Sequence, residues 1–419
     1  MKKETILFLM ISILSFSEDL TLDTMLNNIS TNSYEKNIYN IDIKKNKVNQ
    51  KFYDLDNYNG ITGSSKNTYL REDRAYKTSG TISYGDFYIK GLKEESEKSE
   101  LILGINKNIK DMIYSENDKN LNNNNLDKKI NKLEYLKNIE TKKLSLVDLY
   151  KDYKNIEFEI IAKTNGVKTL KNEEEILKKS FELGKSPNID LKSATINRLN
   201  LEIELKYLKK NKTKIENRFF YDFKINIAGN TLKNIPKKTD ALDKFLNNIG
   251  NKDLDILKIQ KDKIKENINY LKYDNKYPDV SLGLEHDFGS KEESIKENRI
   301  FLEISKDLFY YDNDLENEKY NYQRKVLTIS EETDKRNSEI LKTKEKYDNL
   351  LMEYQVNKNK ANLEKNKYDI KKLEYKLGKA TYLDLIDNFN DYLTYKINAE
   401  KSKNNLNAYI YKIIIRGEI

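Results

Sequence analysis

The sequence has no cysteine and no tryptophan, and its 419 residues include only one histidine, three prolines and 14 glycines. The absence of cysteine excludes disulfides, thiolate metal sites and a lipid-anchoring cysteine. The single histidine, His286, has no second histidine or cysteine to complete a zinc site. Neither a glycine-rich phosphate-binding loop nor a nucleophile elbow occurs. We therefore expect a protein that is not an enzyme and that holds no cofactor or metal centre.

Long apolar runs are also scarce. The longest, Ile6–Phe16, follows Lys2 and Lys3 and ends beside Ser17. A basic start, an apolar middle and a polar exit in that order are typical of a secretory signal peptide, which we place at residues 1–17. The run is shorter than the roughly 20 apolar residues of a membrane-spanning helix. We expect an exported chain without an α-helical anchor; a buried amino-terminal strand or helix is the alternative.

Charge, by contrast, is abundant. Charged residues make up 34% of the chain and aromatic residues 11%, and so few prolines and glycines indicate long helices with few turns. The formal net charge of +8 comes from 76 basic and 68 acidic residues that are interleaved along the sequence. This pattern indicates a mixed, solvated surface and not a nucleic-acid-binding stripe, so we expect no nucleic-acid partner.

The chain repeats itself in two places that occur in the same order. Leu22–Ile29 matches Leu242–Ile249 at an offset of 220, and Phe181–Leu191 matches Tyr375–Leu385 at an offset of 194. The first half therefore carries about 26 extra residues between its two landmarks, the difference between 220 and 194. Because a repeat constrains architecture, we predict an internal duplication with a first repeat at 18–238 and a second at 239–419.

Each half is predicted to contain a helix, two strands, a very long helix, a tight turn and a returning helix. In the second half, residues 240–275 have a helical pattern and 278–309 contain two alternating runs, each of about the length of a tilted transmembrane β-strand. In the first half, Thr81–Ile89 is predicted to be a strand and a weaker one is expected near Tyr58–Tyr69. The polar stretch at residues 117–126 is interpreted as a local break in a helix.

Neither proline nor glycine interrupts residues 312–377, which predicts a helix about 100 Å long. Its apolar residues form two heptad ladders about 200° apart around the helix. The first ladder is Ile340, Tyr347, Tyr354, Ala361, Tyr368 and Tyr375, and the second is Val356, Leu363, Ile370 and Leu377. Two opposed ladders favour a helix with a neighbour on each side, as in a wall or cylinder; a solid bundle with one broad apolar face is the alternative.

Four strands per chain are too few for a membrane barrel, because about eight is the smallest known number. An open sheet in lipid would leave unpaired backbone groups at both edges. We therefore expect the chain to form oligomers.

The order of elements and the two helix tips resemble the outer-membrane efflux family that includes TolC, over Leu20 to about Ile414. The tip motif of that family is matched by Leu183, Gly184 and Asp190, and again by Tyr375, Leu377, Gly378 and Asp384. The resemblance implies a mainly α fold, in which very long antiparallel helices of three protomers form an α-helical barrel in the periplasm. A transmembrane β-barrel in the outer membrane, to which each protomer gives four strands, continues it.

By the same resemblance, the chain is a homotrimeric, passive channel of a tripartite efflux or type I secretion system. Its implied partners are a periplasmic adaptor (membrane fusion) protein, an inner-membrane pump of the RND or ABC class, and outer-membrane lipid. The implied adaptor-docking residues are Leu183, Gly184, Lys185, Leu377, Gly378 and Lys379. Both glycines also suit a helix C′ position with positive φ.

The resemblance further implies an aperture formed by Asp384, Asp387, Asp190 and Tyr375. Repeated around an axis, the two acids of the returning helix would favour cations, and bound divalent ions would block the opening. Their alternative interpretation is that of ordinary acidic residues favoured in a first helical turn. The basic partner that the family has two residues after the second glycine is replaced by Ala380, next to Lys379. A rival function, an exported coiled-coil scaffold or adhesin, would explain the heptads but not the paired strands or the tips.

Overall fold

The computed structural model describes residues 20–31, 33–70, 75–94, 99–238, 242–289, 297–307 and 311–417. The predicted signal peptide, residues 1–17, lies outside the described residues. The chain divides into two compact units. The first holds the chain up to Ser33, Asn138–Gly250 and everything from Asn337 onward, and the second holds Tyr34–Lys137 and Asn251–Arg336.

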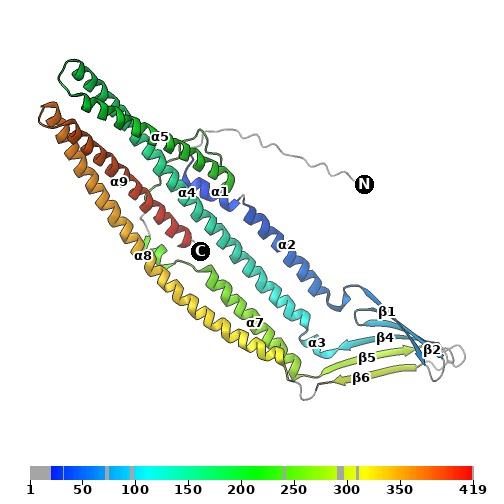
Figure 1. Ribbon diagram of the computed structural model, residues 1–419. Helices are drawn as coiled ribbons and strands as arrows, with labels where there is room; N and C mark the ends of the chain where they lie inside the picture. Colours follow the sequence, from blue (N-terminus) through cyan, green and yellow to red (C-terminus); the bar gives the residue numbers. More distant parts are fainter. Residues whose placement is uncertain are drawn as a thin grey trace, which may run out of the picture. The chain divides into compact units, whose positions relative to one another are not determined.

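The second unit consists of helices and one antiparallel sheet (Figure 1). Its elements are α2 (Tyr34–Leu55), η1 (Asp56–Tyr58), β1 (Ile61–Leu70), β2 (Ala75–Tyr84), β3 (Phe87–Glu94), β4 (Glu100–Asn108), α3 (Ile109–Ile113), the start of α4 (Glu116–Glu182), α7 (Lys252–Lys276), β5 (Asp279–Asp287), β6 (Glu297–Ser305) and the start of α8 (Asn313–Lys376). The strands follow one another in the order β1 to β6, so β4 and β5 join the two halves of the sequence.

The described residues form six strands, and the prediction of four strands per chain is therefore wrong. The strand predicted over Thr81–Ile89 is two strands, because Gly85 and Asp86 form a two-residue hairpin loop between the paired residues Tyr84 and Phe87. Gly85 has a φ of +58°, which a glycine at the first loop position adopts without strain. The Gly-Asp pair between alternating residues was the sequence signal of this hairpin.

The polar run Asn122–Asn125 does not break a helix, in contrast to the interpretation from the sequence, since α4 continues through it. The amide groups have partners on neighbouring elements of the same unit. Asn123 donates to Asn267 Oδ1 over 2.9 Å, and Asn124 donates to the main-chain oxygen of Asn46 over 2.9 Å. These hydrogen bonds satisfy the two donating NH₂ groups, whose burial without partners would be costly.

The first unit has no strand among its described residues. It contains α1 (Leu22–Thr31), most of α4, α5 (Asn188–Phe223), α6 (Leu242–Asn247), the rest of α8 and α9 (Tyr382–Gly417), and residues 224–238 connect α5 toward α6 without regular structure. Ion pairs order its long helices as α5, α4, α9, α8 (Figure 1). They join Arg198 of α5 to Glu174 of α4, Lys401 of α9 to Glu159 of α4, and Arg416 of α9 to Glu339 of α8.

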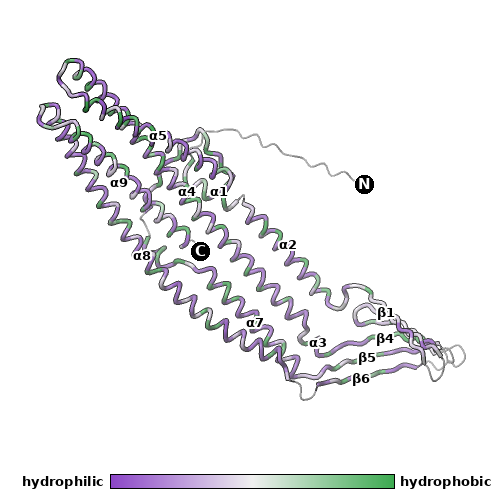
Figure 2. The backbone as a smooth tube through the Cα atoms, in the orientation of Figure 1, coloured by the Kyte–Doolittle hydropathy of each residue, from purple (hydrophilic) through white to green (hydrophobic). Residues whose placement is uncertain are grey.

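Two hydrophobic clusters hold these helices together. Near the tips, α9 contributes six buried residues against α4, α5 and α8: Tyr382, Leu385, Ile386, Phe389, Leu393 and Ile397. Nearer the carboxyl end of α9, a second cluster packs α6 against it. The repeated segments bury the same positions in this unit, Leu22 like Leu242, Leu26 like Leu246, and Ile29 like Ile249. Figure 2 shows the mixed hydrophilic and hydrophobic residues along each long helix, and no helix among the described residues is apolar over a length that would cross a bilayer.

Candidate assembly surfaces and helix tips

One face of the sheet is apolar and exposed across all six strands of the described part. Period-two alternation and the strand register put these side chains on the same face. They are Ile61 and Tyr69 of β1, Tyr76, Ile82 and Tyr84 of β2, Phe87 and Ile89 of β3, Leu101 and Leu103 of β4, Leu282 and Leu284 of β5, and Ile300, Leu302 and Ile304 of β6, all exposed. An apolar patch of this extent marks a surface that another apolar phase covers.

The opposite face is polar and internally bonded. Tyr88 of β3 donates a hydrogen bond to Glu285 of β5, reaching across β4. This is sterically feasible because Gly104 of β4 lies beneath the ring, where an added Cβ would stand only 2.2 Å from Tyr88 Cζ. Gly283 makes room for Phe301 in the same way. The sheet is thus two-sided. One face has large apolar side chains, and the other is mainly polar, with Leu92, Ile102 and Phe301 as its large apolar residues.

The helix α8 places its two ladders differently. Of the first ladder, Ile340, Tyr347 and Tyr354 pack against the second hydrophobic cluster, and Tyr368 and Tyr375 against the first. All members of the second ladder are exposed: Val356 45%, Leu363 52%, Ile370 56% and Leu377 70%. The first ladder of α8 therefore packs against helices of the same chain, and the second ladder forms an exposed apolar face.

The helix α5, at the other end of the four-helix layer, has a matching open face. Ile189, Ile196 and Ile203 recur every seven residues and are 65%, 56% and 68% exposed. Leu199 and Tyr207 extend the stripe. The two helices at the ends of the layer thus each carry an exposed heptad stripe, which is the seam that a partner helix covers.

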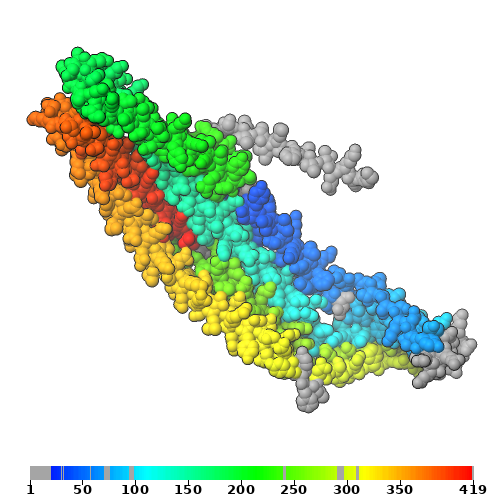
Figure 3. Space-filling model, viewed as in Figure 1, coloured from blue at the N-terminus to red at the C-terminus, as the bar shows by residue number. Residues whose placement is uncertain are grey.

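The two tips of the first unit have the same backbone geometry. Figure 3 shows the first tip in green and the second in orange. At the first, the amide of Gly184 bonds to the Phe181 carbonyl at 2.8 Å and that of Lys185 to the Ser180 carbonyl at 2.8 Å. Gly378 and Lys379 repeat both bonds to Tyr375 and Glu374, at 3.0 and 2.8 Å. This is the Schellman helix end, and the φ values of +69° and +72° confirm the predicted C′ glycines.

The tips differ at the start of the returning helix. Asp384 accepts hydrogen bonds from the Thr381 amide (3.0 Å) and hydroxyl (2.7 Å), while the Asp384 amide donates to Thr381 Oγ1 (3.1 Å), which is a capping box. The hydrogen bonds from Thr381 lower the pKa of Asp384. At the first tip the N-cap is Pro187, whose side chain makes no capping hydrogen bond to the start of α5. Asp387 is exposed one turn beyond Asp384.

The aromatic residues of the second tip are partly interior. Tyr375 packs against the first cluster, with its ring centroid 6.1 Å from that of Tyr382, which is 1% exposed. Burial, followed by the charges of Glu173 and Asp190, raises the pKa of Tyr375. Asp190 and Tyr375 therefore lie within electrostatic reach of each other, although no hydrogen bond joins them in this part of the described structure. The apolar tip residues Leu183 and Leu377 are both 70% exposed.

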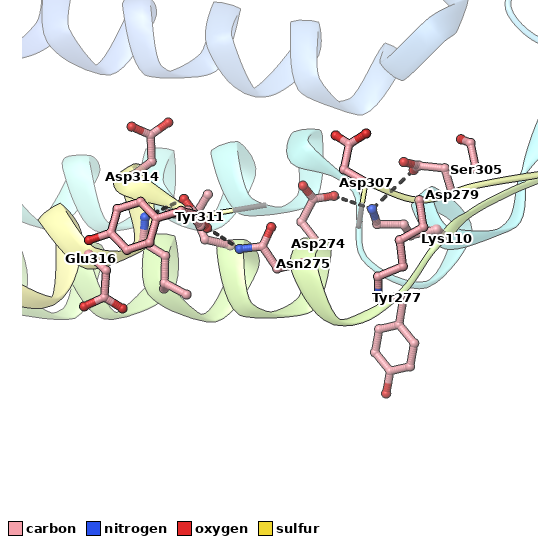
Figure 4. Close-up of a pocket in the computed structure, with 14 residues that line it drawn as sticks. Lys110, Asp274, Asn275, Tyr277, Asp279, Ser305, Asp307, Tyr311, Asp314 and Glu316 are labelled. Carbon is pink, nitrogen blue, oxygen red and sulfur yellow. Dashed lines mark hydrogen bonds and ion pairs between the residues drawn. The ribbon is translucent and has the colours of Figure 1, made fainter. Parts of the chain in front are cut away.

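A pocket of about 640 Å³ lies where the sheet meets the helices of the second unit (Figure 4). Lys110, almost fully buried, lies between two carboxylates, 2.6 Å from Asp274 and 3.2 Å from Asp279. Burial alone would lower the Lys110 pKa, but hydrogen bonds to both acids outweigh it and raise the pKa. The ion pairs tie α3 to α7 and β5, so this pocket is a structural joint. Among the described residues no group of three His, Cys, Asp or Glu is arranged to hold a metal ion.

The sequence matches no protein-family model and no curated protein. The structure has the TolC-like outer-membrane factor fold. Similar solved structures include CusC, with 10% identity, coverage of 94% of this chain and 91% of that chain, and a TM-score of 0.72. The outer membrane protein VceC from Vibrio cholerae has 11% identity, coverage of 94% and 96%, and a TM-score of 0.68. The Campylobacter jejuni CmeC outer membrane channel has 12% identity, coverage of 94% and 85%, and a TM-score of 0.67.

Proposed function

We propose that copies of this chain assemble into an outer-membrane channel of a tripartite efflux or type I secretion system. The observation that carries the proposal is the exposed apolar face that runs across the whole sheet. Lipid is the phase that such a face fits, because the opposite face is polar and bonded and suits a water-filled lumen. The outer membrane is the compartment that the fold likeness favours.

Assembly follows from the open surfaces. A sheet of six strands has two edges and lies below the number that closes a membrane barrel, so its backbone groups need a second copy in lipid. In a ring of copies, the exposed stripe of α5 in one copy can pack against the exposed stripe of α8 in the next copy, because α5 and α8 are the two end helices of the layer. The number of copies, three, is the one that the family resemblance implies. The helices then form an α-helical barrel in the periplasm.

The channel conducts passively, and an inner-membrane RND or ABC pump supplies the energy. A periplasmic adaptor docks on the tips, where Leu183 and Leu377 are exposed beside Gly184, Lys185, Gly378 and Lys379. Drugs, other small molecules and proteins are all compatible with a wide hydrated lumen. An exported scaffold or adhesin would have no use for a sheet with one lipid-compatible face.

The aperture is proposed to lie at the tips, with Asp384 and Asp387 exposed toward it and Tyr375 and Asp190 behind them. The capping box gives Asp384 a structural part as well, because its carboxylate satisfies the Thr381 amide. Asp387 is one turn beyond this box and is the freer acid. Bound divalent cations would block such a ring of carboxylates.

Membrane fractionation tests the proposal. The protein should stay in the outer-membrane fraction after a carbonate wash, and it should have the mass of three chains after extraction in detergent. Release by carbonate, or a monomer in detergent, would contradict the channel.

A further inference from the structure

The hairpin β1–β2 is an addition to the first half of the chain. The first half carries 26 more residues than the second between the two repeated landmarks, 220 minus 194. Ile61–Asp86, which comprises β1, β2 and the turn to β3, is also 26 residues long and lies between those landmarks. Without it, β3–β4 of the first half would correspond to β5–β6 of the second.

The added hairpin is fully integrated into the sheet. β1 pairs with β2 from Ile61↔Tyr84 to Leu70↔Ala75, and β2 pairs with β3 from Tyr84↔Phe87 to Lys77↔Glu94. The apolar face continues onto it through the exposed side chains of Ile61, Tyr69, Tyr76, Ile82 and Tyr84. Its other face carries Thr62 and Ser83, whose hydroxyls are 2.8 Å apart. On the first face these apolar side chains lie toward the two ends of the hairpin, and the paired residues Ser65–Gly80 and Asn67–Thr78 lie between them.

The turn that joins the hairpin to the rest of the sheet is held by specific bonds. Asp86, 8% exposed, accepts hydrogen bonds from the Tyr58 hydroxyl at 2.8 Å and from Lys107 Nζ at 2.7 Å. The Asp86 carbonyl accepts a third bond, from the Asn106 amide at 2.8 Å. Tyr58 also lies against Gly85, where an added Cβ would stand 2.2 Å from the ring. These contacts connect η1, the turn and β4, and fix β2 beside β3.

The hairpin moves the free edge of the sheet from β3 to β1. The strands alternate in direction, and their number is even, so β1 and β6 run in opposite directions. A β6 edge can therefore meet the β1 edge of a second copy as an antiparallel pair, and the ring can close without a parallel pair. The two strands also match in length, with 10 and 9 residues.

We propose that β1 is the edge that pairs with β6 of the next copy, so that each copy gives six strands to the shared barrel. This inference rests on the proposed channel function. Three copies then close a barrel of 18 strands, three times six. The family resemblance alone implied 12. Because barrel diameter grows roughly linearly with strand number, the sheet part is about 1.5 times as wide as a 12-stranded barrel, and barrels of 16 to 18 strands leave an aqueous channel.

The absence of cysteine allows a direct test by disulfide cross-linking in membranes. Ser64→Cys on β1 is combined in turn with Arg299→Cys, Phe301→Cys and Glu303→Cys on β6, which scans the register on the polar face. A parallel series combines Lys90→Cys on β3 with the same three positions. The pair Ile196→Cys with Ile370→Cys, on the open stripes of α5 and α8, reports assembly independently of the sheet.

The expected result is oxidation-dependent dimer and trimer bands for at least one β1–β6 pair, in several-fold excess over every β3–β6 pair. Cross-linking of β3 to β6, or cross-linking at the helices without any β1–β6 product, would overturn the six-strand contribution and leave the channel standing. Absence of every intermolecular product, with a monomer in detergent, would overturn the channel function as well.

Discussion

At the scale of single residues, the glycines have the clearest roles. Gly184 and Gly378 adopt positive φ at the two helix ends, and Gly104 and Gly283 lie under aromatic rings in the sheet. The first pair was predictable from sequence, because a leucine and glycine after a long helical pattern is a C′ signal. The second pair was not, because the ring that covers a glycine comes from a neighbouring strand whose register the sequence does not reveal.

Replacing Gly184 or Gly378 with alanine should lower the free energy of unfolding by about 1 kcal/mol each, because an L-residue at positive φ is strained. No atom lies within 4 Å of the added Cβ at either site, so steric clash adds nothing. Asparagine, which tolerates this conformation, should cost less than alanine. Thermal denaturation of the parent and of the alanine and asparagine variants at each tip measures the order of stability. An alanine variant as stable as the parent would contradict the prediction.

Asp384 and Asp387 should be tested with asparagine, since Asp384→Asn keeps an acceptor for the Thr381 amide and removes only the charge. The double variant should raise the divalent-cation concentration for half-maximal block in planar bilayers severalfold. Asp384→Ala alone should in addition destabilise the tip, because it removes the capping box with Thr381. Unchanged block in the double asparagine variant would remove both acids from the aperture.

At the scale of elements, the sequence predicted the helices far better than the strands. The helix expected over 312–377 is observed over Asn313–Lys376, because no proline or glycine interrupts a pattern of many turns. The helical pattern at 240–275 is split into α6 and α7 around Gly250, where Asn251 caps α7 by accepting a hydrogen bond from the Leu254 amide at 3.0 Å. The β1 strand was predicted only weakly, since Gly63, Ser65 and Asn67 stand where apolar residues would reveal the alternation.

The hairpin of α4 and α5 should weaken in acid. Burial alone would raise the pKa of Glu174, but hydrogen bonds from Thr195 and Arg198 outweigh it and lower the pKa below 4.5. A carboxylate with a lowered folded pKa contributes stability above its unfolded pKa, and this stability is lost as the pH falls through the folded value. Glu174→Gln should thus cost about 1 kcal/mol near neutral pH and flatten the decline of the melting temperature below pH 4.5.

Glu175→Gln serves as the matched control for the contact of Glu174 with α5, because Glu175 lies on the same helix and is exposed to solvent. This control substitution should leave the decline of the melting temperature at acidic pH unchanged. Equal acid sensitivity of the parent and Glu174→Gln would show that the Arg198 contact does not contribute.

The open stripe of α5 should matter for assembly and not for folding of the single chain. Ile203→Asp places a charge in the seam proposed between copies, where burial of an unpaired carboxylate is costly. We expect the variant to keep its helix content by circular dichroism and to lose the trimer in detergent. Lys209→Asp, exposed on the same helix but off the stripe, is the control and should remain trimeric. A stable Ile203→Asp trimer would contradict the use of this face.

At the scale of the whole molecule, a single chain exposes several apolar or unpaired surfaces, and these are the basis of the proposed assembly. The apolar sheet face, the two sheet edges and the two helix stripes are each incomplete without lipid or a second copy. The sequence predicted this incompleteness from strand count and from the opposed ladders of α8. It did not predict six strands for two reasons. The alternating run Thr81–Ile89 contains the turn at Gly85–Asp86, and β4 (Glu100–Asn108) lies outside both strands predicted for the first half.

The most direct test of the account is single-channel recording from the purified, detergent-extracted oligomer in planar lipid bilayers. We predict discrete conductance steps that divalent cations reduce, with larger or more frequent steps for the Asp384→Asn and Asp387→Asn double variant. An intact oligomer that inserts into the bilayer and gives no conductance steps, in the parent or in the double variant, would contradict the channel function.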